Sequence, residues 1–131
     1  MKFSRQSRLL KPAEFKFVFQ QPIRSGDECF RVLARINTKQ QHRLGMAVSK
    51  KACSTAVGRN RIKRVVRESF RTRMPAISEQ ALDIVVMPTT SATEQSNKTL
   101  DESISAHWKR LIRRAGDLET GDSQDQSRTQ R

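Results

Sequence analysis

The sequence has few of the residues from which metal, redox or membrane sites are usually built. Its two cysteines, Cys29 and Cys53, form no CxxC pair, which excludes a zinc ribbon and a dithiol redox motif. We expect both to be reduced thiols. No apolar run approaches the roughly 20 residues of a membrane span. The N-terminus is too polar for the core of a signal peptide. Together these absences predict a cytoplasmic protein without a membrane partner.

Acidic residues are also scarce, and they are scattered along the chain. The 13 Asp and Glu form no metal-ligand spacing, although a two-metal nuclease needs a carboxylate cluster. There is no convincing Ser/His/Asp order or glycine-rich phosphate loop. His42 and His107 each stand alone and are predicted to be ordinary surface or edge histidines. The chain by itself is therefore expected to carry no catalytic residue and no metal site.

Positive charge is the feature that the sequence has in excess. The 131 residues include 26 Lys and Arg, which gives a net charge of +13. Solubility alone needs far less charge. Self-repulsion of this size destabilises the free protein and is relieved by a polyanion, most commonly a nucleic acid. We therefore predict a nucleic-acid partner.

The first half of the chain predicts one helix and two strands. A helix begins at Pro12, carries Phe15, Val18 and Phe19 at helical spacing, and ends at Pro22. Ser25-Gly26-Asp27 is predicted to be a turn. Alternation over 29–37 and again over 44–48 predicts two strands, which we expect to pair as an antiparallel hairpin.

The second half predicts a helix, a buried strand and a last helix. The helix spans 58–74 with an apolar-to-small stripe, and Pro75 stops it; the strand covers 82–87 and ends at Pro88. The last helix starts at Asn97 as N-cap, contains Trp108 in its core face, and stops at Gly116. Its last turns hold four cations, Lys109, Arg110, Arg113 and Arg114.

These elements predict an α+β fold in the order α-β-β-α-β-α, a small sheet packed with helices. Hydrophobic residues make up 35% of the chain, aromatics only 5%, and there is no Tyr, so one modest core is expected. Residues 1–115 form the single predicted domain. Residues 116–131 hold four acids, two arginines and almost no apolar residue, which predicts a disordered acidic tail.

The helix over 58–74 carries the strongest functional signal. Residues 58–73 contain seven basic residues and one acid, Glu68. Asn60, Arg64, Arg67 and Arg71 recur at i, i+4, i+7 and i+11, beside the apolar stripe, and Arg59 and Lys63 extend this face. Guanidinium groups match phosphate oxygens in a bidentate way. A merely solvated face would mix positive and negative side chains, so we predict a helix that binds phosphate groups.

Two smaller features are more ambiguous. Phe15 and Phe19 are either core aromatics or groove residues that stack on unpaired bases. Lys50 and Lys51 follow the second predicted strand and are placed to hold another phosphate, although a lysine pair is common on protein surfaces.

The residues at these positions resemble a known family. Val48-Ser-Lys-Lys51, followed by Ala56-Val-Gly-Arg-Asn-Arg-Ile-Lys-Arg-Val-Val-Arg-Glu-Ser-Phe-Arg71, is similar to the motif of the bacterial ribonuclease P protein subunit, with Arg59-Asn60-Arg61 at its centre. Arg8-Leu-Leu-Lys-Pro-Ala-Glu-Phe15-Lys-Phe-Val-Phe19 resembles the family's first helix. The resemblance spans about residues 5–115.

The resemblance implies a protein subunit that binds the catalytic RNA of ribonuclease P and helps it remove the 5′ leader of precursor tRNA. It implies endoribonuclease activity of the holoenzyme, with the chemistry and the Mg²⁺ on the RNA subunit. It also implies a left-handed βαβ crossover, where physical precedent alone favours a right-handed one. The acidic tail is not part of the shared motif.

Residue by residue, the resemblance assigns the catalytic RNA to one set of side chains and the leader to another. The first set is Arg59, Asn60, Arg61, Lys63, Arg64, Arg67 and Arg71. The second lines a cleft between the first helix and the sheet, and comprises Phe15, Phe19, Lys50 and Lys51.

Other functions remain open from the residues alone. A ribosomal protein or general RNA chaperone has the same composition but no attached enzyme. A protein-only nuclease is disfavoured by the scattered acids. A DNA-binding protein is disfavoured because a strand, not a second helix, follows the basic helix.

Overall fold

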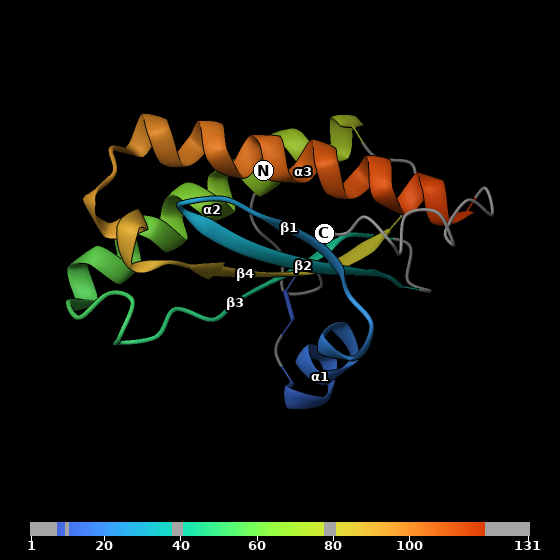
Figure 1. Ribbon diagram of the computed structural model, residues 1–131, viewed down its shortest axis with the longest axis horizontal. Coiled ribbons are helices and arrows are strands. Elements are labelled where there is room, and N and C mark those ends of the chain that lie inside the picture. Colours follow the sequence, from blue (N-terminus) through green and yellow to red (C-terminus); the bar gives the residue numbers. More distant parts are fainter. Residues whose placement is uncertain (1–7, 10, 38–40, 78–80, 120–131) are drawn as a thin grey trace.

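The computed structural model describes residues 8–9, 11–37, 41–77 and 81–119. In these ranges it contains three α-helices, one 3₁₀ helix and a four-stranded sheet, which confirms the predicted α+β class (Figure 1). The elements in chain order are α1 (Pro12–Gln20), β1 (Ile23–Gly26), β2 (Phe30–Ile36), β3 (Arg43–Met46), α2 (Ala56–Ile77), β4 (Leu82–Pro88), η2 (Thr90–Glu94) and α3 (Asn97–Glu119).

The strand order is β1-β2-β4-β3, so the predicted hairpin between β2 and β3 is wrong. β4 pairs with β2 in antiparallel fashion and with β3 in parallel. Nearly every residue of β4 is buried, because its largely apolar run, which only Asp83 interrupts, suits a central position covered on both faces. β4 therefore lies between β2 and β3, which the sequence pattern had predicted to pair directly.

The hairpin that does form joins β1 to β2. Ile23 pairs with Ala34 and Gly26 with Arg31, so Ser25 and Gly26 belong to a strand and not to the predicted turn. The turn begins at Asp27, whose Oδ1 atom accepts the backbone N–H groups of Cys29 and Phe30, each at 2.9 Å. A short aspartate side chain that accepts bonds from the following backbone is typical of such turns.

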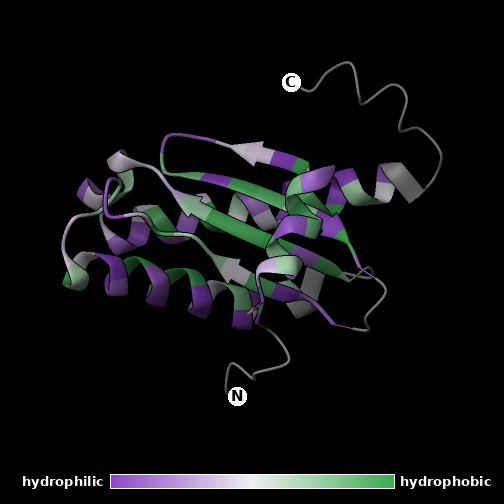
Figure 2. Ribbon diagram, turned by 90° about the horizontal axis from the view of Figure 1, so that it is seen from below, coloured by the Kyte–Doolittle hydropathy of each residue, from purple (hydrophilic) through white to green (hydrophobic). Residues whose placement is uncertain are grey.

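Helices cover both faces of the sheet (Figure 1). α2 and α3 pack over one face and enclose the main core, which includes Phe30, Ile62, Ile84 and Trp108, all fully buried. α1 packs on the other face over a smaller cluster around Val18 and Val85. Figure 2 shows the corresponding pattern, with largely hydrophobic strands and helices divided into a hydrophobic and a hydrophilic side.

The helix ends differ in detail from the sequence predictions. Ser96, not Asn97, caps α3: its Oγ atom accepts the N–H of Thr99 at 3.1 Å. α2 continues past Pro75 to Ile77, so the helix does not stop at Pro75 as predicted. α3 continues past Gly116 to Glu119, so the first four residues of the predicted tail are helical; 120–131 lie outside the described residues.

The segment β3–α2–β4 forms the predicted βαβ unit, with α2 joining two parallel neighbours. The handedness of this crossover stays a prediction. Among the described helices, none is both long and apolar enough to cross a membrane.

Candidate nucleic-acid interface

The predicted stripe of α2 lies on the surface of the molecule. Asn60, Arg64 and Arg67 are exposed and Arg71 is half-buried, while Ile62 and Val66 on the opposite side are fully buried in the main core. The apolar side chains therefore seat the helix and leave a row of cations facing solvent. Arg71 also forms an ion pair with Glu68, the only acid of the motif.

The N-terminal segment adds a cation to this stripe. Arg8 forms a parallel bridge with Leu44 of β3, and Leu9 N–H donates to the Leu44 carbonyl at 3.0 Å. Burial and then repulsion by Arg8 lower the pKa of Arg67 below its ordinary value. Arg8 was not predicted as a site residue, since its approach to α2 depends on this bridge.

Arg59 and Arg61 differ from the stripe because their guanidinium groups have partners inside the protein. Arg59 donates to the Cys53 carbonyl at 2.9 Å. Arg61 donates to Asn97 Oδ1 at 2.7 Å and to the Thr93 carbonyl at 3.1 Å, which links α2 to η2 and the start of α3. Arg61 thus helps to hold the helical layer together. Lys63 is half-buried on the same helix.

Phe15 and Phe19 lie in different surroundings. A Cβ atom added to Gly45 would lie 2.6 Å from Phe15 Cζ, so the Phe15 ring rests directly on the glycine of β3. Phe15 therefore belongs to the smaller core cluster. Phe19 has 45% of its surface exposed and is the aromatic of the pair that is available to a ligand.

A buried ion cluster fastens α1 to the sheet. Arg43 donates to Asp83 Oδ1 at 2.8 Å and to Oδ2 at 2.6 Å, and also to Glu14 Oε2 at 2.9 Å. The hydrogen bond to Asp83 is the main reason that the pKa of Arg43 is raised above its ordinary value. Asn37 completes the site by donating to Asp83 Oδ1 at 2.6 Å.

α1 leaves part of its side of the sheet open. Arg31 lies opposite Gly26 and Met87 in the register; it is exposed, and Met87 is half-buried. Arg24 lies opposite Leu33, a residue of the α1-side cluster, and is exposed as well. These cations and Met87 were not predicted as site residues. The alternating arginines of β2 were the signal, but the hairpin that aligns them with Arg24 was not foreseen.

Lys50 and Lys51 are exposed in the turn between β3 and α2. Thr55 then caps α2 by accepting the N–H of Gly58 at 3.0 Å. The two lysines thus lie close in sequence to the start of the basic helix. No described contact joins them to Phe15 or Phe19.

The prediction that both histidines are ordinary surface or edge residues is wrong for His107. His107 is fully buried between α3 and β1, with Nδ1 2.5 Å from Ser25 Oγ and Nε2 3.1 Å from Asp27 Oδ2, the latter without hydrogen-bond alignment. His42 is half-buried, and its Nδ1 accepts the N–H of Leu82 at 3.1 Å. Burial lowers the pKa of both imidazoles.

The described residues contain no group of three or more His, Cys, Asp or Glu side chains that would hold a metal ion. What the structure does present is a helix with a basic outer face and a partly open, arginine-bearing sheet face. These features define a small nucleic-acid-binding protein.

Comparison with known proteins supports this class of protein and identifies a family within it. The Ribonuclease P family model matches residues 3–112. The ribonuclease P protein component of Aliivibrio fischeri is 48% identical over 111 residues, which cover 85% of this chain and 93% of that protein. That of Methylococcus capsulatus is 46% identical over 86% of each chain.

Solved structures give the same result. The ribonuclease P protein of Staphylococcus aureus is similar with a TM-score of 0.72 and 28% identity, covering 81% of this chain and 97% of the other. That of Thermotoga maritima has a TM-score of 0.71 and 32% identity, covering 79% and 96%. The chain belongs to the bacterial ribonuclease P protein family. Its function is that of the protein subunit of ribonuclease P in tRNA 5′ processing.

Proposed function

We propose that the α2 stripe binds the catalytic RNA of ribonuclease P and that the α1 side of the sheet binds the 5′ leader of precursor tRNA. The observation that carries the first part is the row Asn60, Arg64 and Arg67, which is exposed on the side of α2 opposite the fully buried Ile62 and Val66. Arg71 and Lys63 extend the row. Arginine presents five N–H donors in a fixed fork, which suits phosphate groups.

Arg59 and Arg61 take a double role in this proposal. Each uses one or two donors for contacts inside the protein, with Cys53 or with Thr93 and Asn97. The remaining donors of each guanidinium are available to RNA. Their positions on the surface are therefore set before the RNA binds.

The leader proposal is supported by the chemistry of the open sheet face. Arg31 and Arg24 supply positive charge, and the exposed ring of Phe19 supplies a surface on which a base stacks. Phe15 supports this site from beneath by holding α1 on Gly45. Lys50 and Lys51 contribute charge from the turn that precedes α2.

Endonucleolytic cleavage belongs, in this proposal, to the holoenzyme in the cytoplasm. Because the described donor groups do not fit a metal ion, Mg²⁺ is assigned to the RNA subunit and this chain performs no metal-dependent step. The chain instead positions substrate and neutralises phosphate charge, which lowers the Mg²⁺ concentration that the RNA needs.

The test is cleavage of a precursor tRNA by ribonuclease P RNA at low Mg²⁺, with and without this protein. Correctly placed cleavage only when both are present supports the proposal. Binding to the RNA without any change in cleavage would favour a ribosomal protein or RNA chaperone. Cleavage by the protein without the RNA subunit would favour a protein-only nuclease.

A further inference from the structure

A second group of cations lies at the opposite edge of the sheet from β3. Its members come from β1 and from the C-terminal half of α3, and we call them the β1-edge surface: Arg24, Lys109, Arg110, Arg113 and Arg114. Arg110 is half-buried, and the other four are exposed. Arg110 and Arg114 face β1, where they contact Ser25 and Arg24. Lys109 and Arg113 are four residues apart and share the outer face of α3.

Neutral oxygen atoms hold two of these arginines in place. Arg110 donates to Ser25 Oγ at 2.6 Å, and Ser25 is itself held by the buried imidazole of His107. Arg114 donates to the backbone carbonyl of Arg24. A hydroxyl or carbonyl oxygen fixes the position of a guanidinium group without cancelling its charge.

This arrangement differs from that of arginines which serve packing. Arg43 is neutralised by Asp83 and Glu14, and Arg73 lies 3.2 Å from Asp101. In the part of the chain that the structure describes, no ion pair joins a carboxylate to Lys109, Arg110 or Arg113. Lys109, Arg110 and Arg113 therefore form a patch of positive charge, which the contact of Arg110 with Ser25 anchors to β1.

The helix dipole does not account for these cations. Stabilisation of cations by a helix C-terminus is confined to the last turn. The sequence pattern placed Lys109 to Arg114 there, but α3 extends to Glu119, and its last turn contains no basic residue. Like charges three and four residues apart, such as Arg110 with Arg113 and Arg114, destabilise the free helix. A polyanionic ligand would relieve that repulsion.

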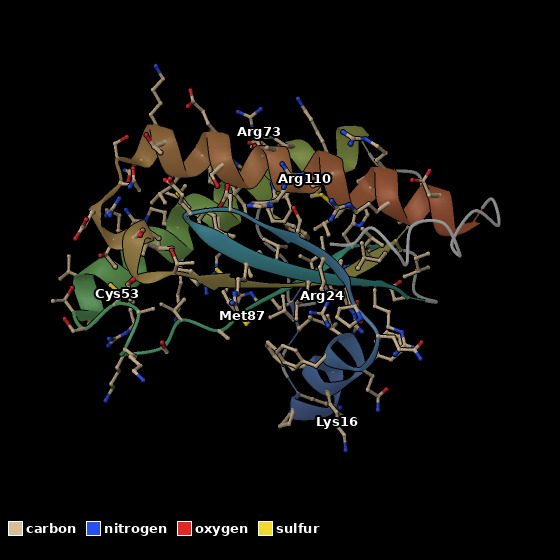
Figure 3. The ribbon with its side chains drawn as sticks, in the orientation of Figure 1. Lys16, Arg24, Cys53, Arg73, Met87 and Arg110 are labelled. Carbon is tan, nitrogen blue, oxygen red and sulfur yellow. The ribbon has the colours of Figure 1, made fainter. Side chains whose placement is uncertain are left out.

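The β1-edge surface is continuous with the proposed leader site. Arg24 alternates with Ile23 and Ser25, which face the α3 side of the sheet, so its side chain lies on the α1 side. Figure 3 shows Arg24 near α1 and Arg110 on α3, on either side of β1. An RNA strand leaving Arg31 would meet Arg24 at the edge and then the guanidinium groups of α3.

We propose that the upstream part of a long 5′ leader crosses the β1 edge and binds the outer face of α3 through its phosphate groups. This inference rests on the proposed function, because it extends the leader site. It assigns to Lys109, Arg110, Arg113 and Arg114 a contact with single-stranded RNA that is distinct from the contact of α2 with the catalytic RNA. Ser25 and His107 act as positioning residues for Arg110.

The experiment uses the reconstituted holoenzyme and a series of precursor tRNAs whose leaders increase in length. The variant is Lys109→Glu/Arg113→Glu, whose two side chains are exposed and lie outside the core. The control is Lys16→Glu/Lys98→Glu, which makes the same change of charge at two exposed positions; Lys16 points away from the sheet in Figure 3. Binding constants for each substrate, and for the catalytic RNA, are measured at fixed salt, and unfolding curves check that both variants fold.

We expect the Lys109→Glu/Arg113→Glu holoenzyme to bind short-leader substrates like wild type and long-leader substrates about tenfold more weakly, with unchanged affinity for the catalytic RNA. The control should show no dependence on leader length. A loss that is equal for all substrates, including mature tRNA, overturns the inference in favour of a contact with the tRNA body. Weaker binding of the catalytic RNA, or no effect at any length, also overturns it. Failure of wild type to stimulate cleavage would instead overturn the proposed function.

Discussion

Arg43 binds both carboxylate oxygens of Asp83, whose side chain is completely buried between β3 and β2. The same guanidinium group reaches Glu14 in the first turn of α1. Glu14 in turn accepts the N–H of Lys11 at 2.9 Å, at the position that precedes the helix. One arginine thus connects the strand at the edge of the sheet, the central strand and the helix that bounds the proposed leader site.

Removal of Asp83 should therefore destabilise the whole fold. We expect Asp83→Ala to lower the free energy of unfolding by about 3–5 kcal/mol, because it leaves Arg43 largely buried without its main partner. Urea unfolding followed by circular dichroism measures this loss. The double variant Arg43→Met/Asp83→Leu should be less destabilised than Asp83→Ala alone. If the double variant is the less stable of the two, the loss does not come from an uncompensated charge.

The contact between Phe15 and Gly45 makes a second prediction about α1. Gly45→Ala should lower the free energy of unfolding by about 1–3 kcal/mol, because the added methyl group overlaps the Phe15 ring and forces it to move. The measurement is thermal unfolding together with limited proteolysis at α1. Phe15→Leu in the Gly45→Ala background should recover part of the loss. Additive losses would show that the ring is not the obstacle.

The two buried histidines predict how stability depends on pH. Burial lowers the pKa of His42 and His107 below about 6.5, the ordinary value, so the unfolded chain takes up protons first. The free energy of unfolding should have its full value at pH above about 6.5. It should fall as the pH drops toward 5, by up to about 1.4 kcal/mol per pH unit for each histidine. For His42 the cause is visible, since protonation of Nδ1 removes the acceptor for Leu82 N–H.

The matched variant for this prediction is His42→Gln, which removes one of the two titrating groups. Its stability should depend less steeply on pH between 7 and 5 than that of wild type. Asp27 does not titrate between pH 7 and 5, because its pKa lies below the ordinary value of 3.8. Burial raises this pKa, but the hydrogen bonds from Ser103, Phe30 and Cys29 lower it by more. An unchanged slope in His42→Gln would mean that His42 does not contribute to the pH dependence.

Substitutions of Arg61 and of Arg64 should distinguish a contribution to stability from a contact with RNA. Arg64 is exposed, so we expect Arg64→Glu to weaken binding of the catalytic RNA and to reduce the salt dependence of that affinity by about one phosphate contact. Arg61→Ala should also weaken RNA binding and should in addition lower the melting temperature, because Asn97 and the Thr93 carbonyl lose their donor. Asn97→Ala serves as the control for Arg61→Ala and should cost stability without changing the salt slope. Unchanged RNA affinity in Arg64→Glu would contradict the assignment of the stripe.

Local sequence patterns predicted the elements whose signal is strong along the chain. The basic helix and the buried strand at Leu82–Pro88 are examples, because their burial follows from the periodicity of the helix and from the largely apolar run of the strand. β1 was missed, since four residues that include Ser25 and Gly26 read as a turn until their pairing with β2 is known. Strand order depends in the same way on contacts between distant residues.

The candidate site shows the same division. The exposed row on α2 was predictable from spacing alone. Other features depend on contacts between residues far apart in the chain. Examples are the bond of Arg61 to Asn97, the contact of the Phe15 ring with Gly45 and the bond of His107 to Ser25. No local pattern encodes such contacts, and they decide which side chains of a motif face solvent.

Phe19 is the residue for which the proposed leader contact makes its sharpest prediction. Because 45% of its surface is exposed, Phe19→Ala should change stability little. Stacking of a base on an aromatic ring is worth about 1–3 kcal/mol, so the variant holoenzyme should bind precursor tRNA with a leader roughly 5- to 150-fold more weakly. Binding of mature tRNA should be unchanged, and Phe19→Trp should retain binding, since it keeps an aromatic face. Equal losses for both RNAs, or a large fall in melting temperature, would place Phe19 in the core and remove it from the leader site.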